Sequence, residues 1–124
     1  DFVISGSYTP SGSDDRLKKN KVGITSALSK VCAMEGFTYE WNDVAEKVGM
    51  ADGDKHLGLS AQTVEPLVPE VVVVNDMLIN HDDGTNDYKT IRYERLVPLL
   101  VEAIKDLKAD NDALKARISA LEGS

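Results

Sequence analysis

Two side chains near the start of the sequence, a serine and a lysine, could together form a catalytic pair. Ser13 and Lys18 lie in the stretch Ser-Asp-Asp-Arg-Leu-Lys-Lys-Asn, directly after a leader rich in glycine, serine and proline. A serine hydroxyl becomes a nucleophile when a base takes its proton, and a lysine can be that base when burial or nearby positive charge favours its neutral form. Arg16, Lys19 and Lys21 supply such charge. The stretch therefore offers a candidate serine–lysine dyad.

The spacing of Ser13 and Lys18 does not by itself favour this pair. On a regular helix, residues five apart are separated by about 140° around the axis, so their side chains do not share a face. A working pair needs Ser13 to precede the first helical turn with the chain folding back, or needs closure by a partner chain. The alternative is that Ser13 or Asp14 is a plain helix N-cap, a position that serine and aspartate favour.

The other reactive side chains of the sequence form no recognisable motif. His56 and His81 lack metal-ligand spacing, and the acidic stretch at residues 80–87 does not match a calcium-binding loop. Cys32 is the single cysteine, so no intrachain disulfide can form, and its apolar surroundings predict a small buried hydrophobe. We expect no metal and no cofactor.

Composition limits the class of protein. The 124 residues fit one domain, and 42% hydrophobic residues allow a core, although a chain of this size buries only about two-thirds of its unfolded surface. A net charge of −7 argues against binding to nucleic acid or to anionic membranes. The sequence contains no apolar run of the roughly 18 residues that would span a bilayer and no pattern typical of a secretion signal.

The clearest periodicity lies in residues 95–121 and predicts a long helix. Apolar residues and one asparagine recur there with alternating spacings of three and four, which is the heptad pattern of a coiled coil. Pro98 is tolerated only in a first turn, which places the helix start near Arg95. The a positions are Val97, Ile104, Asn111 and Ile118, and the d positions are Leu100, Leu107, Leu114 and Leu121.

Charges beside this heptad favour a parallel bundle. Asp110 and Arg117 at g positions are followed by Lys115 and Glu122 at the next e positions, which gives pairs of opposite sign between parallel helices. Asn111 at an a position fixes the register at some cost in stability. β-Branched a residues with leucine at d lean towards two strands. The alternative is an amphipathic helix packed on its own domain.

The remaining segments predict small elements and an α+β fold. Residues 13–34 have a rough helical stripe with a stop at Gly36, and residues 42–55 are polar and typical of turns. A short helix is expected after Ser60, and Asp83–Gly84 is a hairpin signal. Alternating or apolar runs predict strands at residues 37–41, 56–59, 71–74 and 88–94, the last two paired with each other.

Three motifs in order give the sequence a resemblance to a known family. They are Ser-Asp-x-Arg-x-Lys from Ser13, Ala-Gln-x-Val-Glu-x-x-x-Pro-Glu from Ala61, and Tyr-x-x-Leu-x-Pro-Leu-Leu-Val-x-Ala-Ile-Lys from Tyr93. Over about Ser13 to Leu107 the chain resembles the C-terminal, self-cleaving intramolecular chaperone of bacteriophage tail spikes, tail fibres and neck appendages, the endosialidase type.

The resemblance implies a function and a cleavage site. Members of this family help to fold a homotrimeric, β-rich fibre and then cut themselves off before the serine of the Ser-Asp motif, which is the Gly12–Ser13 bond here. By position, Ser13 is the nucleophile on the Gly12 carbonyl, Lys18 is its general base, and Asp14 holds the turn or orients the lysine. The activity implied is that of an autoproteolytic serine endopeptidase acting once.

The resemblance also implies domains and partners. Residues 1–12 are expected to be the end of the upstream fibre, residues 13–94 the globular chaperone, and residues 95–124 a coiled-coil helix that joins three parallel copies. We expect assembly in the host cytoplasm, retention of the fibre in the virion tail and release of the chaperone. Some relatives use a nucleotide in release, but the sequence has no nucleotide fingerprint. Two alternatives stay open: a non-catalytic trimerisation module and a receptor-binding fibre tip.

Overall fold

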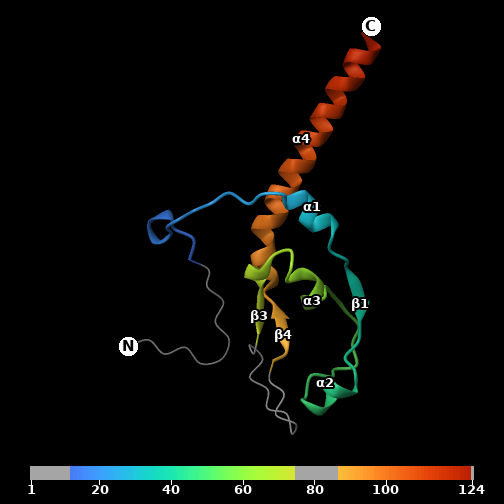
Figure 1. Cartoon of the computed structure of the whole chain (residues 1–124). Coiled ribbons are helices and arrows are strands. Elements are labelled where there is room, and N and C mark those ends of the chain that lie inside the picture. The colour runs from blue at the N-terminus through green and yellow to red at the C-terminus, as the bar shows by residue number, and fades with distance from the viewer. Residues whose placement is uncertain (1–11, 75–86, 124) are drawn as a thin grey trace.

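The fold joins two small sheets and several short helices to one long helix (Figure 1). The computed structural model describes residues 12–74 and 87–123. Residues 1–11, His81 and the hairpin turn at Asp83–Gly84 therefore lie outside the described residues. In the described part of the chain, the mixture of antiparallel strands and helices confirms the predicted α+β class.

Four predicted strands form two antiparallel pairs. β1 (Phe37–Tyr39) pairs with β2 (His56–Gly58), and β3 (Val72–Val74) pairs with β4 (Lys89–Ile91). β-Branched and aromatic residues favour β1, β3 and β4 as strands. All four predicted strands are confirmed in shortened form. The pairing of β4 with the strand before it is confirmed as well.

The long helix α4 (Leu96–Glu122) confirms the strongest prediction from sequence. It continues directly from the short 3-10 helix η3 (Tyr93–Arg95), and Pro98 lies in its first turn, where a missing N–H is tolerated. At 27 residues it is about 40 Å long. Among the described residues no helix combines the length and the apolar character needed to cross a membrane.

The hydrophobic core lies at the first two turns of α4. Helix α1 (Ala27–Cys32) packs along α4, and Leu28 and Val31 face the core from it. The Asp106 carboxylate on α4 accepts a hydrogen bond from the Leu28 N–H at 3.2 Å, which caps α1 from a distant part of the sequence. The buried core residues are Ala27, Val64, Val71, Leu96, Leu99 and Ala103.

The predicted helix over residues 13–34 is wrong. The segment contains one 3-10 turn, η1 (Asp15–Leu17), then an extended stretch, and only then α1. Asn20 and Ser26 adopt positive φ values of 56° and 54°, which a regular right-handed helix excludes. Cys32 at the end of α1 is exposed, so the prediction that it is buried is also wrong.

Three further short helices complete the body. α2 (Asp43–Lys47) lies in a segment predicted as turns, and the Asn42 side chain caps it by accepting a hydrogen bond from the Ala45 N–H at 3.0 Å. α3 (Ala61–Val64) begins after Ser60, as predicted. The 3-10 helix η2 (Pro69–Val71) leads into β3.

A close contact at Gly58 ties the β1–β2 pair to the start of α4. A Cβ added there would lie 2.8 Å from Tyr39 Cε1 and 3.1 Å from Tyr93 Oη. The same Tyr93 hydroxyl accepts a hydrogen bond from the Leu59 N–H at 3.1 Å. The absence of a side chain at Gly58 is therefore what lets both rings pack against this strand.

Gly58→Ala should accordingly destabilise the fold. The new methyl group forces one or both tyrosine rings to move, and such overpacking costs about 1–3 kcal/mol. Urea unfolding followed by circular dichroism measures the change. Gly36→Ala is the matched control, because nothing lies within 4 Å of a Cβ at Gly36. Equal stability of the two variants would contradict this account of Gly58.

Candidate active site

The 3-10 turn η1 brings Ser13 and Lys18 together. The Leu17 N–H donates to the Asp14 carbonyl at 3.0 Å and the Lys18 N–H donates to the Asp15 carbonyl at 3.1 Å, which closes one tight turn. Ser13 precedes this turn and Lys18 ends it in extended conformation. The Lys18 Nζ consequently lies 2.8 Å from the Ser13 Oγ and donates a hydrogen bond to it. This is the arrangement in which the chain folds back before the first turn.

Asp14 holds the turn and contacts Arg16. Its carboxylate accepts from the Arg16 N–H at 2.9 Å, as an N-cap does, and from the Arg16 Nε and Nη2 at 3.1 and 2.8 Å. The side-chain bonds from Arg16, followed by the backbone bond, hold the pKa of Asp14 below its ordinary value. The Asp14 carboxylate therefore stays charged at lower pH than an ordinary aspartate. Its hydrogen bonds stabilise the turn.

The candidate dyad is fully open to solvent in the single chain. Every residue from Gly12 to Ser26 is exposed, and this segment, called the arm below, leaves the body near the contact of α1 with α4 (Figure 1). In the present hydrogen bond the lysine is the donor. A lysine acts as a base only in its neutral form, and burial is what favours that form.

The other titratable groups noted in the sequence lie elsewhere. The Nε2 of His56 on β2 contacts the two carboxylate oxygens of Asp52 at 3.1 and 2.9 Å, and its ring stacks on Tyr39. Bonds from the Asp54 N–H and from His56 lower the pKa of Asp52. In residues 12–74 and 87–123, no three His, Cys, Asp or Glu side chains are grouped to hold a metal ion.

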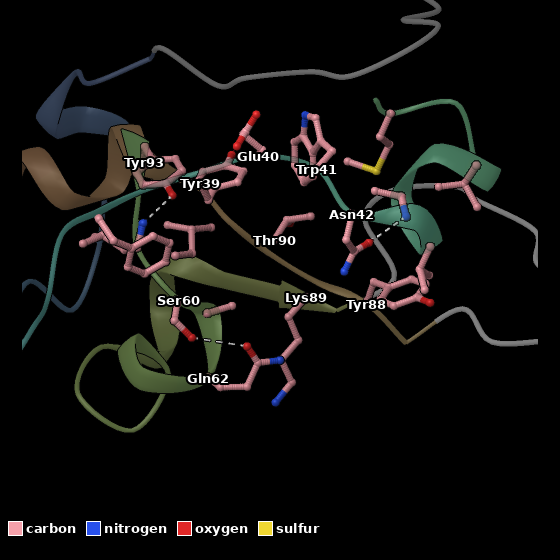
Figure 2. A pocket seen from close by; sticks show the side chains of 18 residues that line it. Tyr39, Glu40, Trp41, Asn42, Ser60, Gln62, Tyr88, Lys89, Thr90 and Tyr93 are labelled. Atoms are coloured by element: carbon pink, nitrogen blue, oxygen red, sulfur yellow. Dashed lines mark hydrogen bonds between the residues drawn. The ribbon is translucent and has the colours of Figure 1, made fainter. Parts of the chain in front are cut away.

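An aromatic groove is the feature that sequence reasoning missed. A cavity of about 800 Å³ lies between the β1–α2 segment and β4 (Figure 2). Tyr39 and Trp41 pack edge to face in its wall, 5.1 Å between ring centroids, and burial followed by the nearby Tyr93 raises the pKa of Tyr39. The alternation of residues 37–41 indicated a strand. What made the groove unpredictable is that its opposite wall comes from segments distant in sequence.

Helix α4 uses one face for the body and leaves its heptad face open. Leu96, Leu99 and Ala103 are the residues of α4 buried in the core, and none of them is at an a or d position. The apolar a and d residues, from Val97 to Leu121, are instead between 45% and 76% exposed. Packing on its own body therefore does not explain the heptad.

Comparison with known proteins places these features in a family. The family described as "Chaperone of endosialidase" matches residues 13–73, so its first matched residue is Ser13. The chain belongs to this family and is a chaperone domain of a kind found in phage tail fibre proteins.

Its relatives are phage fibre proteins. The "Long tail fiber protein Gp37" of Enterobacteria phage K3 is 34% identical over 106 residues, which cover 86% of this chain and 8% of the relative. The protein of the same name from Enterobacteria phage T2 is also 34% identical, with 86% and 7% covered. That of Salmonella phage S16 is 26% identical over 110 residues, with 89% and 14% covered. The chain thus spans a small fraction of the length of these relatives.

Proposed function

We propose that this chain drives the trimerisation and folding of an upstream tail-fibre segment and then releases itself by cutting its own Gly12–Ser13 bond. The observation that carries the cleavage step is the 2.8 Å contact between Lys18 Nζ and Ser13 Oγ, directly beside the Gly12 carbonyl in sequence. The start of the family match at Ser13 adds support. The enzyme class is that of an autoproteolytic serine endopeptidase.

The proposed chemistry needs the two side chains and a water molecule. Neutral Lys18 takes the hydroxyl proton of Ser13, whose Oγ bonds to the Gly12 carbonyl carbon. The bond from that carbon to the Ser13 nitrogen breaks as the nitrogen gains a proton, which leaves an ester between Gly12 and the Ser13 side chain. Water then hydrolyses the ester to the Gly12 carboxylate and the free hydroxyl. The two side chains and one water molecule account for each bond that is made and broken.

The open heptad face of α4 supports the trimerisation step. Three parallel copies would bury the apolar a and d residues against one another and hold the upstream chains in register. Family resemblance favours three strands over the two that the a and d residue types suggest. Release in the host cytoplasm would leave the assembled fibre kinetically trapped in the virion tail.

A non-catalytic trimerisation module is the second candidate function. The observation that favours it is the exposure of the arm, because a lysine acts as a base most readily in buried surroundings and every residue from Gly12 to Ser26 is exposed. In this case α4 would still join the copies, but the Gly12–Ser13 bond would stay intact.

One experiment separates the two functions. The chain is produced with its natural upstream fibre segment, and the products are analysed by native mass spectrometry and by N-terminal sequencing. We expect a trimeric fibre and a separate fragment that begins at Ser13. Trimers that remain intact in every assembly condition would favour the non-catalytic module. A single-copy product would contradict both functions.

Two substitutions of Asp14 should distinguish its role as a cap of the turn from the role of its charge. Asp14→Ala removes the acceptor for the Arg16 N–H and should lower the cleavage rate roughly 2- to 10-fold, because fewer molecules hold the turn. Asp14→Asn keeps a cap oxygen and should retain most of the rate. Because the folded pKa of Asp14 is lowered, the contribution of its charge is present at neutral pH and is lost as pH falls through that value. Equal rates in the two variants would contradict the cap.

A further inference from the structure

The arm carries apolar side chains that its own body leaves uncovered. Leu17 is 81% exposed and Val22 is 87% exposed, and Ile24 on the same segment is exposed as well. Several exposed apolar side chains on one segment that stands away from the body form a surface that a partner could cover. The surface that covers them would have to lie outside the arm's own α1 and α4.

The aromatic groove offers an apolar surface of the complementary kind. Its wall at the β1–α2 side includes Phe37, Trp41, Val44 and Met50, and Phe37 and Val44 are exposed. Figure 2 shows the groove open between Tyr39 and Trp41 on one side and Thr90 on the other. Such a groove can receive separate apolar side chains, and Leu17 in η1 and Val22 in the stretch after it are side chains of this kind.

The charges of the two surfaces are opposite. Residues 13–25 of the arm carry four cationic and two acidic side chains, a net charge of +2. Residues 40–54, the segment that includes the α2 side of the groove, carry five acidic and one cationic side chain, a net charge of −4. Of these acidic residues Glu40 lines the groove itself, and Lys89 on the opposite wall is paired with Glu65. Asp14 and Asp15 are paired with Arg16 and Lys21, and within residues 12–74 and 87–123 neither Lys18 nor Lys19 has an acidic partner. Complementary charge of this kind selects and orients a partner.

The position of the two surfaces indicates a second copy as the partner. In Figure 1 the arm extends to one side of α4, while β1 and α2 lie on the other side. A cyclic assembly is built from interfaces that join two different surfaces, one on each side of every protomer. Bundling through α4 would therefore turn the arm of one copy towards the groove of its neighbour.

From these four observations we propose that the arm of one protomer docks into the aromatic groove of the next, with Leu17 and Val22 as the apolar contacts. The proposal rests on the trimer of the proposed function. It adds a specific interface through which each copy holds the segment that carries the neighbour's Ser13 and Lys18.

Cross-linking between two distinguishable chains tests the docking. Cys32→Ser provides a background without cysteine. Val22→Cys in a chain with a long tag and Val44→Cys in an untagged chain are co-expressed, and the purified assembly is treated with a short bismaleimide. We expect a covalent product that contains one chain of each size. Because docking holds the thiols at a high effective concentration, it should form at least about tenfold faster than with Ser29→Cys, an exposed control on α1, in place of Val22→Cys.

A charge exchange supplies a second readout. Lys19→Glu in the arm should lower the cross-linking rate, and Glu46→Lys in the receiving chain should restore part of it. A further chain that carries both Val22→Cys and Val44→Cys tests docking of an arm into its own groove, which would give an intrachain product. That product, or cross-linking no faster than the Ser29→Cys control, would overturn the proposal.

Native mass spectrometry of the same samples keeps the two proposals apart. A trimer without the expected cross-link overturns the docking and leaves the proposed function standing. A single-copy species overturns the trimer itself, and the docking with it.

Discussion

Ser13→Ala should abolish release of the chaperone fragment. Without the hydroxyl no ester can form between Gly12 and residue 13, so the upstream fibre and the chaperone remain one chain. The assay is denaturing electrophoresis of the chain produced with its natural upstream fibre segment, with mass spectrometry of each band. Assembly should be unchanged, since Ser13 is exposed and makes no contact with the core.

Lys18→Ala should give nearly the same result for a different reason. General base catalysis contributes about 10²- to 10⁴-fold to such reactions, so the cleavage rate should fall by at least about 100-fold. Lys18→Arg should not rescue it, because an arginine does not give up its proton under these conditions. Lys55→Ala is the matched control, since it removes an exposed lysine outside the arm and leaves the dyad intact. Release by the Ser13→Ala and Lys18→Ala variants at the normal rate would exclude this pair as the dyad.

Replacing Leu107 and Leu114 by aspartate should separate the copies. Both are d positions on the open face of α4, and both are more than half exposed in the single chain. A leucine that becomes buried contributes about 1.5–3 kcal/mol, and the loss recurs in every copy, so the association constant should fall by several orders of magnitude. The aspartates would in addition place unpaired charges inside the bundle. Native mass spectrometry or light scattering should then find single chains.

The control for this prediction lies on the same helix. Ala109→Asp with Ala116→Asp introduces the same two charges with the same seven-residue separation, on the side of α4 opposite to the heptad stripe. We expect this double variant to assemble normally. If both double variants assemble alike, the heptad face is not the interface. Circular dichroism should show that the body of the single chains remains folded, because its core uses Leu96, Leu99 and Ala103.

The long helix and the paired strands could be predicted from sequence because their signals are periodic and local. The heptad gave α4 to within about a residue at each end, and alternation around Tyr39 and Thr90 gave β1 and β4. The prediction of a helix over residues 13–34 was wrong because its apolar stripe was interpreted as a helix face packed on the core. In the structure the stripe is divided by positive φ at Asn20 and Ser26, and only its last third reaches the core.

The sequence allowed us to predict which residues form the candidate site, but not the geometry that brings them together. Helical spacing separates Ser13 from Lys18, and only a single 3-10 turn, closed by the cap at Asp14, returns the lysine to the serine. The groove could not be predicted at all, since Trp41 and Thr90 become neighbours only through the tertiary fold. Cys32 was misplaced because α1 is short and directs Ala27 and Val31, rather than its last residue, at the core.

The second half of α4 has a consequence for the fragment after release. Beyond Asp106, whose carboxylate binds α1, each residue of α4 up to Gly123 is exposed, so this part of the helix has little support from the described body of the chain. A lone helix of about 20 residues is only marginally stable in water. On dilution a released fragment should therefore come apart into copies whose globular halves keep their shape while the distal turns of α4 melt, and this melting would make reassociation slow.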